Sequence, residues 1–242
     1  MFSKKPIKLD SIDSTNNYTL RMKEILPFKE GLVVTANYQT GGNGERGKSW
    51  ESSIGDNLLI SVVIEPNIPT KDQFLLSKCV ALALYDLLIL YADALSVKWP
   101  NDILVGKQKI AGILIQNILK GNKITHSIIG IGVNVNQTKF KAYSLQATSL
   151  NLLLNKTFDI CNIQEQLLKC LAERIKQLRN GADQQKEYLS ALFLNNKVAA
   201  FESEDQKFMG IIKGVSKSGK LLIQLEDDKI AEFENQTIKH LF

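Results

Sequence analysis

The sequence is poor in the residues that build metal centres and disulfide frameworks. Its 242 residues include three cysteines and two histidines. Cys79, Cys161 and Cys170 form no C-x-x-C pair, and their odd number favours neither a disulfide framework nor a zinc site. His126 and His240 lie outside every motif described below, so we assign neither of them a catalytic role. We therefore expect a protein of the reducing cytoplasm whose chemistry depends on other side chains.

Long apolar runs and a strong excess of one charge are also missing. The apolar stretches 54–66 and 82–91 are too short or too interrupted to span a membrane, and residues 1–10 are too polar for a signal peptide. The net charge of +5 is modest and the acidic residues are interspersed, which does not favour a general nucleic-acid binder. We expect a protein that binds neither DNA nor membranes, with a local basic site for an anion or an acidic partner.

The most informative segment is the glycine-rich stretch 37–50, which reads NYQTGGNGERGKSW and follows a β-rich run at 32–36. Glycines at this spacing permit backbone conformations that other residues avoid and allow a ligand to approach closely. Arg46 and Lys48 indicate that this ligand is an anion.

Part of this segment also fits a different motif. Residues 42–49, GNGERGKS, match the phosphate-binding pattern G-x-x-x-x-G-K-[ST] letter for letter. That pattern requires a helix directly after the loop, with its N-terminus facing the phosphates. Residues 50–57 have no apolar periodicity, and a strand-like run follows them. We therefore reject the interpretation as a nucleotide-binding P-loop.

The periodicity of the remaining chain predicts an α+β fold. Amphipathic or buried helices are expected after the potential cap residues at 13–16 and over 73–93, 165–178 and 183–194. Strands are expected at 57–65, 95–99, 103–105, 109–119 and 124–135, and the short links among the last three indicate antiparallel pairing. Short alternating strands follow from residue 197. We predict an α+β domain over residues 1–194 and a small β-barrel over 195–242.

Several segments together resemble the biotin protein ligases, enzymes that attach biotin to carboxylase subunits. They are STN at 14–16, YQ at 38–39, the glycine loop closed by Trp50, KWPND at 98–102, KIAGIL at 109–114, IGIGVNVN at 129–136 and GVSKSGKLL at 214–222. Their order and spacing match the family across nearly the whole chain. The resemblance implies a catalytic domain like that of class II aminoacyl-tRNA synthetases, with a mixed or antiparallel sheet flanked by helices, and a C-terminal SH3-like barrel. The resemblance is to the monofunctional type of ligase, without the N-terminal DNA-binding domain.

The resemblance also implies a two-step reaction. Biotin and MgATP give biotinyl-5'-adenylate and pyrophosphate, and the adenylate then acylates a lysine in the biotin-acceptor domain of a biotin-dependent carboxylase. The carboxylate and the phosphate that react are both negative, so the site must neutralise charge and exclude water from the mixed anhydride. A monomer or weak homodimer is expected.

The family's functional residues carry over onto specific positions of this chain. The expected catalytic residues are Lys109, Asp102 and Arg46. The expected biotin-binding residues are Ser14, Thr15, Asn16, Gln39, Asn43, Gly44, Glu45, Lys109, Gly112, Gly130 and Gly132. The expected ATP-binding residues are Arg46, Lys48, Trp50, Asn101, Lys109 and Asn134.

Some of these residues have an assignable chemical task. Lys109 would supply a cation to the carboxylate and the phosphate, although a lysine at the start of a strand is otherwise most often solvated, with little effect on stability when removed. Trp50 would stack on adenine. Asp102 would either bind Mg²⁺ or orient the acceptor lysine.

This chain departs from the family pattern within the glycine loop. Asn43 stands where the family commonly has arginine, and Glu45 stands where arginine or glutamine is usual. A carboxylate near a phosphoryl group repels it. We therefore expect the loop to hold the adenylate more weakly than in relatives, with Arg46 able to offset the effect by pairing with Glu45.

Two other functional classes remain open. One is a lipoate or octanoate ligase or transferase of the same fold, although no cysteine nucleophile lies in the motifs. The other is a non-catalytic biotin-binding protein, which the altered loop makes conceivable.

Overall fold

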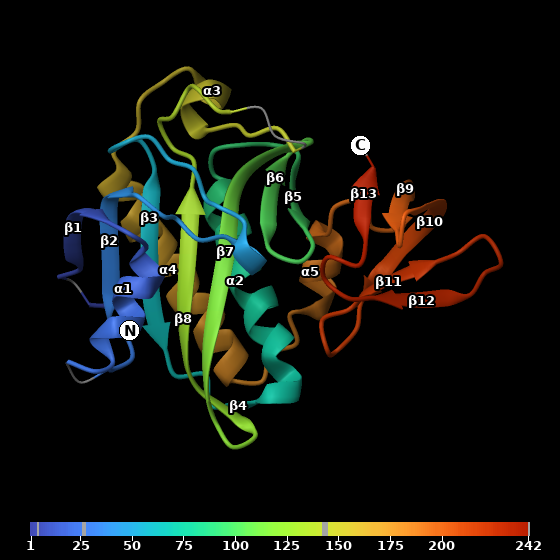
Figure 1. The fold of residues 1–242 in the computed structure, drawn as a ribbon, viewed down its shortest axis with the longest axis horizontal. Helices are drawn as coiled ribbons and strands as arrows, with labels where there is room; N and C mark the ends of the chain where they lie inside the picture. The colour runs from blue at the N-terminus through green and yellow to red at the C-terminus, as the bar shows by residue number, and fades with distance from the viewer. Residues whose placement is uncertain (4, 26–27, 142–144, 242) are drawn as a thin grey trace.

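The computed structural model describes residues 1–3, 5–25, 28–141 and 145–241, and contains two separate β-sheets (Figure 1). The larger sheet has helices on both faces, and the smaller is an antiparallel sheet at the C-terminal end of the chain. The α+β class predicted from the sequence is confirmed. Among the described residues, no helix is both long and apolar enough to cross a membrane.

The larger sheet is mixed. Its strands, in spatial order, are β1 (Ile7–Ile12), β2 (Val33–Gln39), β3 (Leu58–Ile64), β8 (Lys123–Val133), β7 (Gln108–Lys120), β6 (Asp102–Val105) and β5 (Leu95–Lys98), with β4 (Ile68–Pro69) paired to β8. The pair β1–β2 is parallel, and every other pair is antiparallel, including the predicted neighbours β6, β7 and β8. All seven residues of β3 are buried, which explains why its sequence is apolar except for Ser61.

The helices divide between the two faces of this sheet (Figure 1). Helix α1 (Thr15–Met22) packs on β2, β3 and β8, whereas α2 (Gln73–Leu88) and α4 (Ile160–Arg179) pack on each other behind the sheet. The short helices α3 (Leu150–Leu154) and α5 (Gln185–Ala191) follow strand β8 and helix α4. Consequently one face of the sheet is covered by the main hydrophobic core, and the other carries α1 and the glycine loop.

Several predicted boundaries are wrong. Helix α2 ends at Leu88 rather than 93, and α5 covers only Gln185–Ala191 of the predicted 183–194. Helix α4 begins five residues earlier than predicted, because the Asp159 carboxylate caps it by accepting a hydrogen bond from the backbone N–H of Cys161. Strand β1 and helix α3 were not predicted.

The smaller sheet has the strand order β12-β11-β10-β9-β13. Its strands are β9 (Val198–Ser203), β10 (Gln206–Val215), β11 (Leu221–Gln224), β12 (Ile230–Phe233) and β13 (Lys239–Leu241). Its first strand begins within the segment where we predict the second domain. For brevity we call residues 195–241 the C-terminal barrel, after the shape predicted from the sequence; what the structure shows there is this antiparallel sheet.

The C-terminal barrel is attached to the larger sheet through the KWPND segment. The indole N–H of Trp99 donates a hydrogen bond of 2.9 Å to the carbonyl of Gly219 in the β10–β11 turn. A Cβ on Gly219 would lie 2.7 Å from Phe74 of α2, so only glycine fits this turn against the helix. The chain segment that leads into the C-terminal barrel is also bonded to the larger sheet. The backbone N–H of Phe193 donates a hydrogen bond of 2.9 Å to the carbonyl of Val97 in β5.

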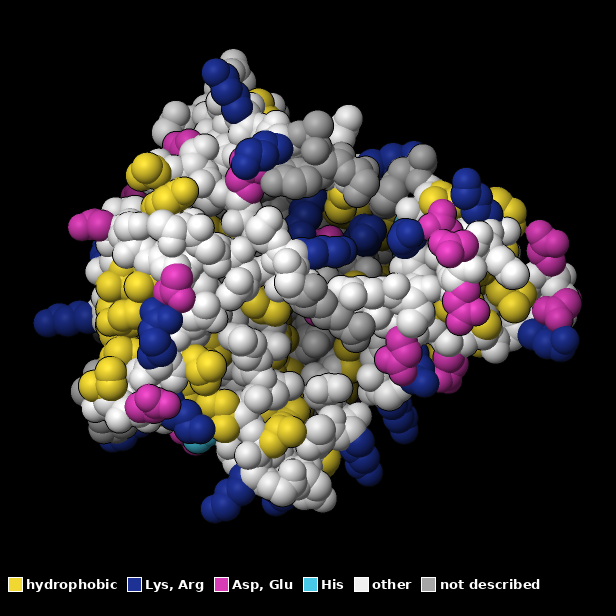
Figure 2. All heavy atoms as spheres, in the orientation of Figure 1, with side chains coloured by type: hydrophobic (Ala, Val, Ile, Leu, Met, Phe, Trp, Pro, Cys, Tyr) yellow, Lys and Arg dark blue, Asp and Glu magenta, His cyan; other side chains and the backbone are white. Residues whose placement is uncertain are grey.

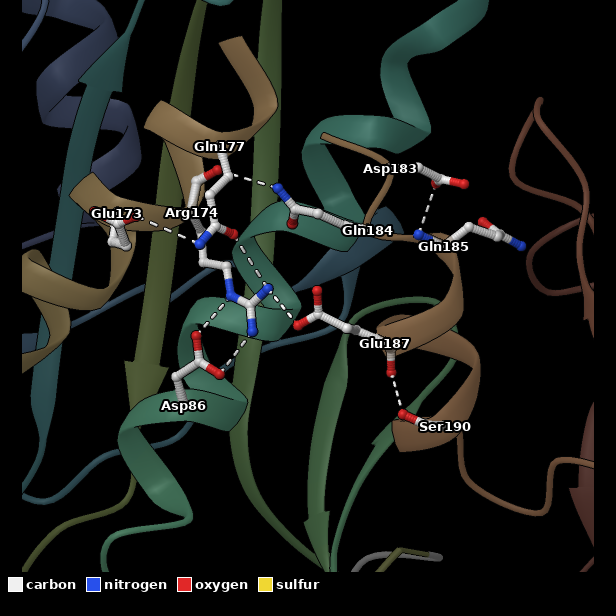
Figure 3. A network of polar contacts seen from close by, with 9 residues as sticks. All are labelled: Asp86, Glu173, Arg174, Gln177, Asp183, Gln184, Gln185, Glu187 and Ser190. Atoms are coloured by element: carbon white, nitrogen blue, oxygen red, sulfur yellow. Dashed lines mark hydrogen bonds and ion pairs between the residues drawn. The ribbon is translucent and has the colours of Figure 1, made fainter. Parts of the chain in front are cut away.

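An ion cluster around the buried Arg174 ties three helices together (Figure 3). Arg174 of α4 is 8% exposed and donates two hydrogen bonds to Asp86 of α2, at 2.6 and 2.9 Å. It donates a third, of 2.6 Å, to Glu187 of α5. The hydrogen bonds to Asp86 are the main cause of a raised pKa for Arg174, which stays charged at every pH of interest. Because α5 leads into the junction with β5, this cluster helps to fix the C-terminal barrel.

We predict that Arg174→Ala lowers the free energy of unfolding by about 2 kcal/mol, since it removes three charge-assisted hydrogen bonds made by a buried guanidinium while the remaining carboxylates can still be solvated. Urea denaturation measures the effect. The control is Arg21→Ala, which removes an exposed pair with Asp13 and should leave the unfolding midpoint unchanged. Equal midpoints for Arg174→Ala and wild type would contradict the assigned role.

Candidate active site

Three glycines leave part of the sheet without side chains on the face opposite the main core. Gly112 of β7 pairs directly with Gly132 of β8, and Gly130 lies two residues before Gly132 on the same face. The alternate residues of β8 point into the core with α2 and α4; they are Ile129, Ile131 and Val133. The glycines therefore form a surface without side chains, on which other groups can lie directly against the backbone.

Two side chains of the protein occupy this surface. A Cβ on Gly130 would lie 2.4 Å from Oδ1 of Asn16. A Cβ on Gly132 would lie 2.4 Å from the indole of Trp50, and one on Gly112 would lie 2.9 Å from the same ring. From the sequence we expected these three glycines to bind biotin. The structure shows that they admit Asn16 and Trp50, so any ligand on this face must contact these two side chains.

The STN segment at the start of α1 forms a polar network with side chains from three strands, β2, β3 and β7. The backbone N–H and the hydroxyl of Thr15 both donate to Oε1 of Gln39, at 2.7 and 3.0 Å. The hydroxyl of Ser61 lies 2.8 Å from that of Thr15 and donates to Oδ1 of Asn16 at 2.6 Å. The Asn16 amide in turn donates to Oε1 of Gln116 at 3.0 Å. The network fixes the orientation of each amide group.

Ser14 precedes this network and is 2% exposed. Its backbone has the extended conformation of an N-cap residue, but its side chain makes no capping hydrogen bond to α1. A ligand could therefore engage its hydroxyl without uncapping the helix. We did not predict Ser61 as a site residue. Its signal in the sequence is a single hydroxyl in the otherwise apolar run of β3.

Lys109 and Asp102 form an ion pair beside Trp50. Lys109 Nζ lies 2.6 Å from Asp102 Oδ1, and the two side chains are 28% and 14% exposed. The Lys109 ammonium also lies 5.3 Å from the centroid of the Trp50 ring, within cation–π range. The expectation of a solvated lysine, removable at little cost, is therefore wrong. Its removal would leave a mostly buried carboxylate without its counter-ion.

Besides Lys109 and Lys48, a third lysine, Lys98, belongs to the same region. It was not among the predicted site residues. It pairs in register with Asp102 across β5 and β6. Burial is the main cause that lowers the pKa of Lys98; Asp102 opposes the shift, while Lys109 and Lys48 add to it. Figure 2 shows basic side chains gathered in a hollow between the larger sheet and the C-terminal barrel. The charges of the three lysines act on one another here and exceed that of Asp102, which favours an anion.

The two asparagines expected to bind nucleotide hold strand β7 in place. The side-chain amide of Asn101 donates to the carbonyl of Ile113 at 2.8 Å. The amide of Asn134, 3% exposed, donates to the carbonyls of Thr148 at 2.9 Å and Lys109 at 3.4 Å. Asn134 therefore positions the backbone of Lys109, Asn101 anchors β7 at Ile113, and direct contact of either with ATP remains a prediction.

The glycine loop folds back on itself in a tight turn. A 3₁₀ turn covers Glu45–Gly47, an isolated β-bridge joins Asn43 to Ser49, and the N–H of Trp50 donates to Gly42 at 2.8 Å. Residues 50–57 contain no helix, which supports our rejection of a P-loop.

Three residues of this loop, Asn43, Gly44 and Glu45, each make a defined contact. Asn43 donates to Asn17 of α1 at 3.3 Å. Gly44 is closed in by its own turn, since a Cβ there would lie 3.1 Å from the carbonyl of Lys48. Glu45 accepts a hydrogen bond from Asn235 of the C-terminal barrel, a partner that the sequence did not indicate. The catalytic and ATP-binding assignments of Arg46 concern a side chain outside the part that the structure describes.

The described residues do not by themselves form a magnesium site. They contain no group of three or more His, Cys, Asp or Glu side chains able to hold a metal ion. Asp102 is the expected ligand, and one of its oxygens is bonded to Lys109. A single carboxylate fits only a Mg²⁺ ion that is bound mainly by substrate phosphates and water.

Comparisons with known proteins agree on one family. Residues 9–134 match the model of the biotin/lipoate A/B protein ligase family. The chain is 31% identical over 229 residues to the bifunctional ligase/repressor BirA of Escherichia coli, covering 89% of this chain and 68% of that protein. It is 29% identical over 203 residues to the biotin–[acetyl-CoA-carboxylase] ligase of Mycobacterium tuberculosis, covering 81% and 74%. The solved biotin protein ligase of Aquifex aeolicus in complex with biotin and ATP superposes with a TM-score of 0.76 at 27% identity, covering 99% of each chain.

We predict that Gly132→Ala displaces Trp50 from the sheet, because the new methyl group would overlap the indole. The tryptophan emission should shift to longer wavelength, while buried Trp99 gives a constant background. Gly41→Ala is the control, since its Cβ would meet its nearest neighbour at an ordinary 3.5 Å. An unchanged spectrum in Gly132→Ala would contradict this packing.

Proposed function

The chain belongs to the biotin/lipoate A/B protein ligase family, and from this premise we propose that it is a biotin protein ligase. It would activate biotin with ATP to biotinyl-5'-adenylate and transfer the biotinyl group to a lysine of a carboxylase acceptor domain. The observation that carries this proposal is the Lys109–Asp102 pair under Trp50, on the same glycine-lined face as the polar network of Thr15 and Gln39.

The polar network favours biotin over lipoate as the substrate. The ureido ring of biotin offers two N–H donors and one carbonyl acceptor, whereas the dithiolane ring of lipoate offers no comparable hydrogen-bonding groups. Oε1 of Gln39 is occupied by Thr15, so its amide N–H groups are the part available to a carbonyl. The Ser14 hydroxyl can accept from a ureido N–H. A polar pocket of this kind discriminates strongly against a substrate that leaves it unpaired.

The cysteines support neither a lipoyl nor an octanoyl thioester mechanism. Cys79 is buried in the core, and burial raises the pKa of its thiol to about 12. Cys161 and Cys170 both lie on α4, which packs on the opposite face of the sheet from Trp50. A thiolate nucleophile next to Lys109 is therefore not available from the cysteines of this chain.

In the first step, an oxygen of the biotin carboxylate attacks the α-phosphorus of ATP, and the bond to pyrophosphate breaks. Lys109 carries the charge that brings the two anions together and stabilises the crowded negative charge of the transition state. Lys98 and Lys48 add to the positive potential of the region. Magnesium that enters with ATP supplies further charge neutralisation on the phosphates. Trp50, lying over the backbone at Gly112 and Gly132, restricts access of water to the mixed anhydride.

In the second step, the amine of the acceptor lysine attacks the acyl carbon, and AMP leaves with the bonding electrons. The amine must lose a proton to form the amide. Asp102 is a carboxylate beside Lys109 and can orient the incoming amine and accept its proton. This assigns Lys109 mainly to the first step and Asp102 to the second.

We predict that Lys109→Ala lowers biotin-dependent ATP–pyrophosphate exchange by at least about a hundredfold, because it removes a charge from a developing anion. Lys107→Ala is the matched control, since this exposed lysine lies in the β6–β7 turn two residues away. Lys109→Ala with Asp102→Asn tests whether the loss follows from misfolding, because the double variant no longer buries an unpaired charge.

The same assay separates the alternatives. Exchange with lipoate but not biotin would identify a lipoate ligase, and exchange with neither would favour a non-catalytic binding protein. Exchange by Lys109→Ala within about twofold of wild type would overturn the role of Lys109.

A further inference from the structure

The sequence departure at Glu45 has a structural partner far along the chain. The side-chain amide of Asn235 donates a hydrogen bond of 2.6 Å to Oε2 of Glu45. We propose that Asn235 is a positioning residue: it holds the glycine loop closed through Glu45 and thereby slows escape of the activated intermediate. This inference rests on the proposed ligase function.

The loop transmits this restraint to the site because it is internally bonded. Glu45 is the first residue of the 3₁₀ turn, and the N–H of Gly44, directly before it, donates to the carbonyl of Lys48 at 2.6 Å. The bridge between Asn43 and Ser49 closes the loop directly before Trp50. Glu45 and Trp50 therefore belong to one small folded unit. A contact that fixes Glu45 also fixes the ring that covers Gly112 and Gly132.

The barrel end of the contact is equally well anchored. Asn235 lies in the turn before β13, where the backbone N–H and the hydroxyl of Thr237 donate to Glu234 at 3.2 and 2.9 Å. The Thr237 carbonyl accepts from Ser203 of β9 at 2.6 Å. The next residue, Ile238, is 7% exposed and packs in the hydrophobic core. The turn is therefore a rigid support rather than a free loop.

A second contact places the same part of the barrel next to β5, the strand that carries Lys98. The ring of His240 on β13 stacks on that of Phe193 with 6.3 Å between centroids, and the backbone N–H of Phe193 donates to Val97 of β5. His240 of β13 is mostly buried, and burial together with the charge of Lys98 lowers its pKa to about 4. It is thus neutral at physiological pH and adds no charge to the region. Strand β13 and its preceding turn therefore lie along one side of the site, with Asn235 reaching the glycine loop.

This contact changes the expected effect of Glu45. From the sequence we expected its carboxylate to repel the adenylate. In the structure one carboxylate oxygen is bonded to an amide donor, and a hydrogen bond to a charged group is among the stronger kinds. In this chain Glu45 therefore serves as the loop's attachment to the barrel. The restraint that it provides requires no arginine at this position.

The direct test is the rate at which biotinyl-adenylate leaves the enzyme, measured by rapid filtration after one turnover. Asn235→Asp places two carboxylates face to face and should speed release at least about tenfold, given the strength of a hydrogen bond to a charged acceptor. Asn235→Ala should have a smaller effect in the same direction. Gln206→Ala removes an exposed amide at the start of β10 in the same barrel and is the matched control.

An exchange of the two side chains distinguishes positioning from general damage. Glu45→Asn combined with Asn235→Glu keeps the summed length of the pair and swaps donor and acceptor. It should restore slow release, whereas each single substitution alone should not. Failure of the pair to restore slow release would overturn the inference.

Trypsin cleavage after Lys48 gives a readout that is independent of catalysis. Cleavage should be faster in Asn235→Asp than in wild type, with or without biotin and ATP, because the loop opens more often. Unchanged cleavage and unchanged release in Asn235→Asp would overturn the inference while leaving the ligase assignment in place. A wild-type protein that forms no adenylate would instead overturn the proposed function, and with it the role in retention.

Discussion

The site depends on a packing constraint: three positions on two adjacent strands must lack a side chain. At Gly112, Gly130 and Gly132 an added Cβ would overlap Trp50 or Asn16. Only because these positions are bare can α1 lie close enough for Asn16 to enter the network with Ser61 and Gln116. The same constraint lets the ring of Trp50 lie flat enough to meet Lys109. The polar end and the charged end of the site are thus consequences of one clear strip of backbone.

Much of the frame could be predicted from the sequence because its signals are local. Strand β3 is an apolar run interrupted only by Ser61, and β7 and β8 are joined by a Gly-Asn turn, so a buried strand and a hairpin can each be recognised. Strand β1 was missed because it is a partly exposed edge strand with charged residues in alternation. Helix α5 was predicted too long because its apolar pattern continues into Leu192 and Leu194, which pack in the core from irregular backbone.

The candidate site was only partly predictable, and the reason is again distance along the chain. Lys109, Asp102 and Trp50 could be named from motifs, and the structure brings them together. What the motifs could not show is how they are held. Ser61 meets Thr15 and Asn16 across more than forty residues of sequence, and Lys98 is affected by charges on three other segments. The hydrogen bond of Glu45 could not be foreseen because its partner, Asn235, lies in a turn between two strands of the other sheet.

The contact between Glu45 and Asn235 joins residues 190 positions apart, and this separation matters during synthesis of the chain. At about 5 to 20 residues per second, roughly 10 to 40 seconds pass between translation of the loop and translation of its anchor. In the later part of that interval, once Gly132 has been made, the ribosome-bound chain carries Lys109, Trp50 and the glycine strands without the barrel turn that restrains them. A ligase that folds in this order can form the acyl-adenylate before the contact that retains it exists. Newly made chains would therefore be the ones most prone to lose a reactive acyl-adenylate to the surrounding solution.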